Sequence, residues 1–233
     1  DEEVSRGLGD VYKRQTVAGD SLPGLNLIIG SNRNESLMYI PEGAELSDYL
    51  EGYFPPETWN DIKVMLGPEL SELAQMDRLR SAVQYTCPSL SLAQAAEEAG
   101  GFVYVYRFDR VREGFEVIGA YHGAELPYVF DTHDPWMPTN AVDLEVTDAL
   151  VDYWVAFLAD GSPNEFQSGR KETSDSEMGG SEINSAETGR AMWSAWSQQQ
   201  QALVIADEIS TQTHPDAALC EFLNAARVAS ARH

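Results

Sequence analysis

Residues 119–130 read GAYHGAELPYVF, and the rest of the chain is best interpreted outward from this stretch. It follows residues 102–108, FVYVYRF, whose alternating aromatic and β-branched side chains predict a β-strand. Loops that follow strands often carry functional groups on a rigid scaffold, so His122 stands where a general base can act. Gly119 and Gly123 allow the backbone to turn tightly around its imidazole. A structural or surface role is the alternative for a lone histidine.

The residue pattern of this stretch resembles the histidine motif of type-B carboxylesterases, the family that includes the cholinesterases. The resemblance implies an α/β-hydrolase fold, in which helices flank a mainly parallel sheet, and a Ser-Glu-His triad. It implies that His122 is the catalytic base and that Glu125 is a supporting or structural carboxylate.

Residues 25–30, LNLIIG, form a short apolar run that predicts a second, buried strand. The polar segment that follows resembles the family's Gly-x-Asn-x-Asp-Glu-Gly motif, and the resemblance assigns the triad acid to Glu35. Two residues depart from that motif, because Asn34 replaces Asp and Ser36 replaces Gly. Neither change removes the carboxylate that orients the histidine, although both leave the conformation of the local turn unpredicted.

Met38 and Tyr39 lie just after Glu35. In the resembled family this position lines the substrate gorge, so the resemblance implies that both residues belong to a substrate pocket. An ordinary place in the hydrophobic core is the alternative.

The remaining regular structure follows from apolar spacing, from Ser and Pro at helix starts and from Gly at helix ends. Helices are predicted at 47–54, 56–65, 68–85, 87–99, 142–159 and 216–231, and a third strand at 201–207. The order of acid strand, helices and base strand agrees with the chain order of Ser, acid and His in α/β-hydrolases.

Cys87 and Cys220 are the two cysteines of the chain. The resemblance to cholinesterases implies that they form a disulfide, and two free buried thiols are the alternative. A disulfide implies an oxidising compartment, so we expect a secreted or periplasmic protein.

The nucleophile expected of this family is missing from the sequence. The elbow that carries the serine has the pattern Gly-x-Ser-x-Gly, and this pentapeptide does not occur in the chain. Residues 16–233 are therefore expected to be the C-terminal part of a carboxylesterase domain, truncated before the acid. The parent protein is expected to be a serine carboxylesterase that hydrolyses small-molecule carboxylic esters without a cofactor, and the fragment alone is expected to be inactive.

Two segments differ from the rest in composition. Residues 1–15, DEEVSRGLGDVYKRQ, resemble translated adapter sequence of the kind found in metagenomic gene predictions, and a disordered natural tail is the alternative. Residues 165–190 are rich in Ser, Gly, Glu and Thr, which predicts a flexible exposed loop.

Charge and composition limit the classes of function. The formal net charge of −23 argues against nucleic acid as a partner, because nucleic-acid binders show a basic footprint. No apolar run approaches the roughly 18 residues that a membrane span needs. The oligomeric state is left open.

Two other functions compete with an esterase. One is a catalytically inactive, cholinesterase-like adhesion module, as in the neuroligins. The other is a small metal-binding protein that uses His122, Glu125, His133 and Asp134, although their spacing matches no recognised metal site.

Overall fold

The computed structural model describes residues 24–164, 190–197 and 199–230. The predicted tail at residues 1–15 lies outside the described residues. So does the predicted loop at residues 165–190, apart from Arg190.

A four-stranded mixed sheet forms the centre of the molecule, in the order β1 (Leu27–Asn32), β2 (Val103–Phe108), β3 (Gln201–Ile205) and β4 (Ile209–Thr213). β1 runs parallel to β2 in a continuous register from Leu27 opposite Val103 to Asn32 opposite Phe108. β2 and β3 are also parallel, whereas β3 and β4 are antiparallel. The three predicted strands are present and parallel, as the resemblance implied for most of the sheet, and β4 is a strand that the sequence analysis missed.

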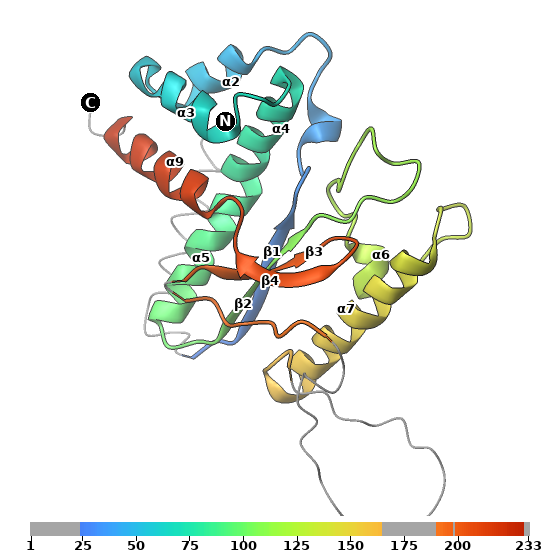
Figure 1. The fold of residues 1–233 in the computed structure, drawn as a ribbon. Coiled ribbons are helices and arrows are strands. Elements are labelled where there is room, and N and C mark those ends of the chain that lie inside the picture. The colour runs from blue at the N-terminus through green and yellow to red at the C-terminus, as the bar shows by residue number, and fades with distance from the viewer. Residues whose placement is uncertain (1–23, 165–189, 198, 231–233) are drawn as a thin grey trace, which may run out of the picture.

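Helices cover both faces of this sheet (Figure 1). They are α2 (Leu46–Tyr53), α3 (Trp59–Leu66), α4 (Glu72–Ser81), α5 (Cys87–Glu98), α6 (Leu126–Val129), α7 (Ala141–Asp160) and α9 (Ala217–Ser230), with 3-10 turns η1 (Leu37–Tyr39) and η2 (Pro56–Thr58) and a π-helical segment η3 (Ala82–Thr86).

Alternate side chains of β2 serve opposite faces of the sheet, as the pleat of a strand requires. Val103 and Val105 pack into the core that contains α4, α5 and α9. Tyr104 and Phe108 pack into a second core with α7. The sheet is thus the middle layer of three.

The helix predicted at residues 68–85 differs from the one observed. It begins at Glu72, because the Ser71 hydroxyl accepts a hydrogen bond from the backbone nitrogen of Ala74 at 3.3 Å and caps the helix. Beyond Ser81 it continues through the π-helical segment directly into α5. Pro88 stands in the first turn of α5, where its missing N–H is tolerated. α4, η3 and α5 therefore form one long rod from residue 72 to residue 98.

The disulfide between Cys87 and Cys220 is present, with the two Cα atoms 5.1 Å apart. It joins the start of α5 to the first turn of α9. The C-terminal helix is therefore bonded covalently to the layer that carries the long rod.

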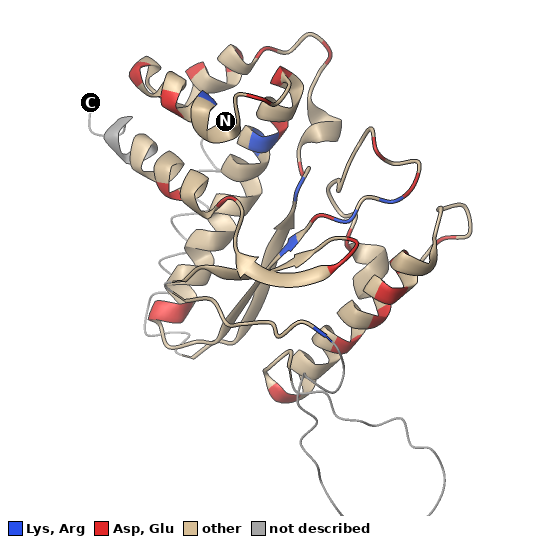
Figure 2. Ribbon diagram, in the orientation of Figure 1, with Lys and Arg blue, Asp and Glu red and all other residues tan. Residues whose placement is uncertain are grey.

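Acidic residues are spread over most helices, while several basic residues gather near the ends of β1 and β2 (Figure 2). Within the described ranges, no helix combines the length and the apolar character needed to cross a membrane.

Candidate active site

Glu35 and His122 meet at the carboxyl end of the parallel strands. Glu35 follows β1 by three positions, and His122 lies on the long loop that leaves β2. Glu35 Oε2 lies 2.6 Å from His122 Nδ1, and Glu35 Oε1 accepts a hydrogen bond from the backbone nitrogen of Asn32 at 2.7 Å. The predicted contact between the two side chains is present.

The two partners differ in their access to solvent. The Glu35 side chain is 6% exposed, whereas that of His122 is 48% exposed. Burial raises the pKa of Glu35, and the hydrogen bonds from Asn32 and His122 oppose that rise. A buried carboxylate thus holds one nitrogen of an imidazole whose ring remains accessible from outside.

Asn32 connects the end of β1 to both sides of His122. Its Nδ2 donates to the carbonyl oxygen of Tyr121 at 2.7 Å and to Glu125 Oε2 at 2.5 Å. Asn32 therefore links Glu125 and the backbone of Tyr121 to the end of β1. The sequence analysis missed Asn32, although a polar residue at the end of an apolar strand is a usable signal.

Asn34 joins two loops: the acid loop (residues 33–36), which carries Glu35, and the base loop (residues 109–125), which carries His122. Its backbone forms a parallel bridge with Tyr121, and its Oδ1 accepts a hydrogen bond from the backbone nitrogen of Ala120 at 3.0 Å. Gly119 makes this approach possible. Its φ is +64°, and a Cβ atom there would lie 2.2 Å from Asn34 Oδ1.

Asp77, on α4, holds the backbone on both sides of Glu35. Its carboxylate accepts hydrogen bonds from Asn34 Nδ2 at 2.7 Å and from the backbone nitrogen of Ser36 at 3.2 Å. Ser81, one turn further along α4, donates to the same carboxylate at 3.1 Å. Burial raises the pKa of Asp77, and these donors oppose the rise. The sequence analysis assigned no role to Asp77, although a charged residue at the buried positions of a helix is a usable signal.

Aromatic rings surround the imidazole. The rings of Tyr39 and Tyr85 have centroids 6.4 Å and 5.1 Å from that of His122. Met38 and Tyr39 are about half exposed, at 50% and 54%, so neither belongs to the hydrophobic core. The sequence analysis missed Tyr85, because its proximity depends on the π-helical segment that carries it.

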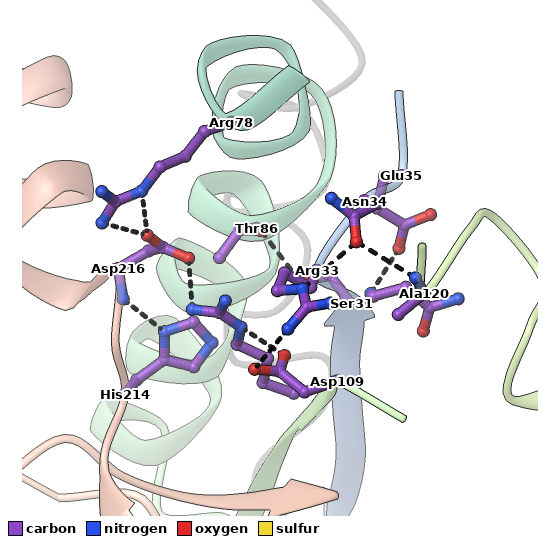
Figure 3. Close-up of polar contacts among 12 residues, drawn as sticks. Ser31, Arg33, Asn34, Glu35, Arg78, Thr86, Asp109, Ala120, His214 and Asp216 are labelled. Atoms are coloured by element: carbon purple, nitrogen blue, oxygen red, sulfur yellow. Dashed lines mark hydrogen bonds and ion pairs between the residues drawn. The ribbon is translucent and has the colours of Figure 1, made fainter. Parts of the chain in front are cut away.

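A cavity of about 420 Å³ lies next to Asn34 and Asp77. Its wall includes Asp216, which binds two arginines: Arg78 Nη2 lies 2.8 Å from Asp216 Oδ1, and Arg107 Nη1 lies 2.9 Å from Asp216 Oδ2 (Figure 3). Neither Glu35 nor His122 lines this cavity.

The four residues of the metal hypothesis do not come together. His133 Nδ1 accepts a hydrogen bond from Arg112 at 2.6 Å, because a guanidinium can only donate. His133 Nε2 therefore carries the proton and donates to Thr147 Oγ1 at 2.7 Å. Among the residues that the structure describes, no group of three or more His, Cys, Asp or Glu side chains is arranged to hold a metal ion.

Comparison with known proteins adds a family assignment. The model of the carboxylesterase family matches residues 67–223, more than half of the chain. Among curated proteins, none matches the sequence significantly.

Several solved structures share the fold. A PNB esterase is 18% identical with a TM-score of 0.60, over 90% of this chain and 40% of its own. Aspergillus niger EstA is 15% identical with a TM-score of 0.68, over 92% and 42%. The carboxylesterase of Geobacillus stearothermophilus is 19% identical with a TM-score of 0.64, over 91% and 42%. The chain thus has the fold of part of an α/β-hydrolase and spans about two fifths of the length of these proteins.

Proposed function

We propose, because the chain belongs to the carboxylesterase family, that Glu35 and His122 are the acid and the base of a serine-dependent ester hydrolase. The observation that carries the proposal is the 2.6 Å contact between Glu35 Oε2 and His122 Nδ1 at the carboxyl end of a parallel sheet. Open α/β sheets bind their ligands at this edge.

The geometry defines a role for each nitrogen of the imidazole. With Glu35 ionised, His122 Nδ1 keeps its proton and donates a hydrogen bond to the carboxylate, which leaves the lone pair of Nε2 free to accept a proton. In the proposed reaction, a serine hydroxyl attacks the ester carbonyl and Nε2 takes its proton. The C–O bond then breaks, and Nε2 passes the proton to the departing alcohol. Water repeats the cycle on the acyl-enzyme and releases the acid. Glu35 stabilises the imidazolium that forms in each half of the cycle.

The serine itself comes, in this proposal, from polypeptide outside this sequence, which has no Gly-x-Ser-x-Gly elbow. Support comes from β1, which pairs with β2 on one side and has no strand partner on the other among the described residues. Its apolar residues Leu27, Ile28 and Ile29 are only partly buried. A strand that pairs with this edge would place its own carboxyl end beside Glu35 and His122.

The same proposal extends to substrate, domain and location. Residues 16–233 would form the C-terminal part of the catalytic domain, with Met38 and Tyr39 beside the substrate, a small carboxylic ester. The Cys87–Cys220 disulfide favours an oxidising compartment, and hence a secreted or periplasmic protein.

Hydrolysis of p-nitrophenyl acetate tests the mechanism. The chain alone should show no serine-dependent turnover, because the imidazole has no hydroxyl to activate. Joining the chain to an upstream segment that contains Gly-x-Ser-x-Gly should give turnover, and His122→Ala should abolish it. Glu116→Gln, an exposed change in the loop that carries His122, is the matched control and should leave turnover intact.

Two outcomes would contradict the proposal. Serine-dependent turnover by the chain alone would show that the nucleophile is misassigned. A folded, joined protein without turnover would favour the inactive adhesion module.

A further inference from the structure

The acid of the proposed dyad is held from both sides by a single buried carboxylate on α4. Asp77 Oδ2 accepts from Asn34 Nδ2, which precedes Glu35, and Asp77 Oδ1 accepts from the backbone nitrogen of Ser36, which follows it. Asp77 is 2% exposed and Ser36 is 1% exposed. Water has little access to these partners. The Ser36 N–H also donates to Ser81 Oγ at 3.1 Å, so Asp77 and Ser81 together hold the backbone beside Glu35.

Asn34 passes this constraint to the histidine loop. The amide of Asn34 donates from Nδ2 to Asp77. It also accepts at Oδ1 from the backbone nitrogen of Ala120, as Figure 3 shows, and Ala120 lies two positions before His122. The backbone nitrogen of Asn34 also donates to the carbonyl oxygen of Ala120 at 3.0 Å. A continuous series of hydrogen bonds thus runs from α4 through Asn34 to the loop that carries the base.

The donors and acceptors of this series match in only one way. Asp77 offers two acceptor oxygens, and its three donors are Asn34 Nδ2, the Ser36 backbone N–H and the Ser81 hydroxyl. Asn34 must donate at one end and accept at the other, which an amide does and a carboxylate does not.

We propose that Asn34 and Asp77 act as one complementary pair of positioning residues, which sets the acid loop and the base loop at the distance that the Glu35–His122 contact requires. This proposal depends on the proposed function only for the catalytic role that it gives to the Glu35–His122 contact. The pair itself is defined by hydrogen bonds between described residues.

Exchange of the two side chains tests the pair. With Asn34→Asp alone, two carboxylates face each other. With Asp77→Asn alone, the new amide nitrogen faces either Asn34 Nδ2 or the Ser36 backbone N–H, and Ser36 keeps Ser81 Oγ as its other acceptor. In the double variant Asn34→Asp/Asp77→Asn, the new amide at position 77 donates to the new carboxylate at position 34 and accepts from Ser36 and Ser81. The new carboxylate still accepts from the backbone nitrogen of Ala120. Every hydrogen bond of the series is retained.

Two measurements on the purified chain read the result. The first is the equilibrium constant of unfolding, which each single change should shift about tenfold or more toward the unfolded state, because a buried polar group is left unsatisfied. The double variant should recover most of this loss. The second is the ¹H–¹⁵N NMR signal of the His122 imidazole N–H that is bonded to Glu35. This signal should broaden or shift in each single variant and return in the double variant.

The outcomes separate a positioning role from a merely structural one. Restored stability together with an imidazole signal that never changes in the single variants would overturn positioning, and additive losses in the double variant would overturn the pair. If the single variants do not fold, recovery of folding by the double variant is the deciding result. Asn60→Asp/Asp61→Asn makes the same exchange at two exposed residues of α3 and should change neither measurement.

Neither measurement requires ester hydrolysis, so this inference and the proposed function can fail separately. In the joined enzyme, the single changes should lower kcat with little change in KM, and the exchange should restore kcat. If the His122 imidazole signal is lost in the single variants and restored in the double variant, but the joined protein has no turnover, the positioning pair is supported and the esterase proposal is contradicted.

Discussion

Glu35 uses its two carboxylate oxygens for two different partners: Oε1 lies 2.7 Å from the backbone nitrogen of Asn32, and Oε2 lies 2.6 Å from His122 Nδ1. One oxygen fixes the side chain to the end of β1, and the other orients the imidazole. A donor in place of Oε1 would lose the hydrogen bond from Asn32, and a donor in place of Oε2 would force the other tautomer on His122.

The first prediction concerns Glu35→Gln. The backbone N–H of Asn32 requires the amide oxygen, so the amide nitrogen must face His122 Nδ1 and donate to it. The imidazole proton then moves to Nε2, and the lone pair needed by a general base is lost. In the joined enzyme, kcat should fall by about 10⁴-fold, the size known for the wrong tautomer in a triad. The ¹⁵N shifts of His122 in the chain alone should show the changed tautomer, and an unchanged tautomer would refute this assignment.

The second prediction concerns acid sensitivity at His214. This side chain is 2% exposed, its Nδ1 accepts a hydrogen bond from the backbone nitrogen of Asp216, and burial lowers its pKa to about 4. In the unfolded state the pKa of His214 is about 6.5, so between pH 6.5 and 4 this side chain is protonated in the unfolded state and neutral in the folded state. The stability from a neutral His214 is therefore complete above about pH 6.5 and falls by up to about 3 kcal/mol as the pH approaches 4.

His214→Asn is the variant that checks this prediction. Its amide oxygen can accept from the same backbone nitrogen two positions on. Urea denaturation should show a shallower loss of stability between pH 6.5 and 4 than in the natural chain. The raised pKa values of Glu35 and Asp77 act in the opposite direction, so the difference between the two proteins isolates His214. Parallel pH profiles would mean that His214 is not responsible.

The third prediction concerns the disulfide. Cys87 and Cys220 are separated by 133 positions, and closing so long a loop contributes at most about 5 kcal/mol on the chain-entropy model. Reduction should lower the urea midpoint by a corresponding amount. The Cys87→Ala/Cys220→Ala variant should show the lower midpoint with or without reductant, and a midpoint equal to that of the oxidised chain would exclude a stabilising bridge.

The fourth prediction compares two glycines of the base loop. Gly119 and Gly114 both have positive φ, of 64° and 81°, but a Cβ atom at Gly114 meets nothing within 4 Å. Gly114→Ala should cost only the backbone strain of about 1–2 kcal/mol. Gly119→Ala should cost more in thermal or urea unfolding, because Asn34 must move away from Ala120. Equal losses would show that the contact with Asn34 is unimportant.

Local patterns predicted the elements that determine the fold. β1, β2 and β3 are short apolar runs bounded by turn residues, and these properties are visible without a structure. β4 was missed because Ile209–Thr213 is an edge strand, with mostly polar and partly exposed residues that give no apolar run. The predicted start of α5 at Cys87 agrees with the structure, but the first helix was predicted to begin at residue 68 and begins at Glu72, where Ser71 caps it.

The candidate site was only partly visible in the sequence. Glu35 and His122 were found through their resemblance to a family motif, since no local rule brings together residues 87 positions apart. Asp77 lies 43 positions from Asn34, and its carboxylate acquires meaning only when α4 packs beside the acid loop. Buried hydrogen bonds between distant segments are properties of the packed structure, and they explain what the sequence could not supply.

The bond between Cys87 and Cys220 also gives the chain a closed covalent circuit. His122 lies inside that circuit and Glu35 lies outside it. A single protease cut between Cys87 and His122 therefore opens the circuit without releasing either half of the molecule. The segment with the acid and the segment with the base would migrate as one species on a non-reducing gel and as two species after reduction.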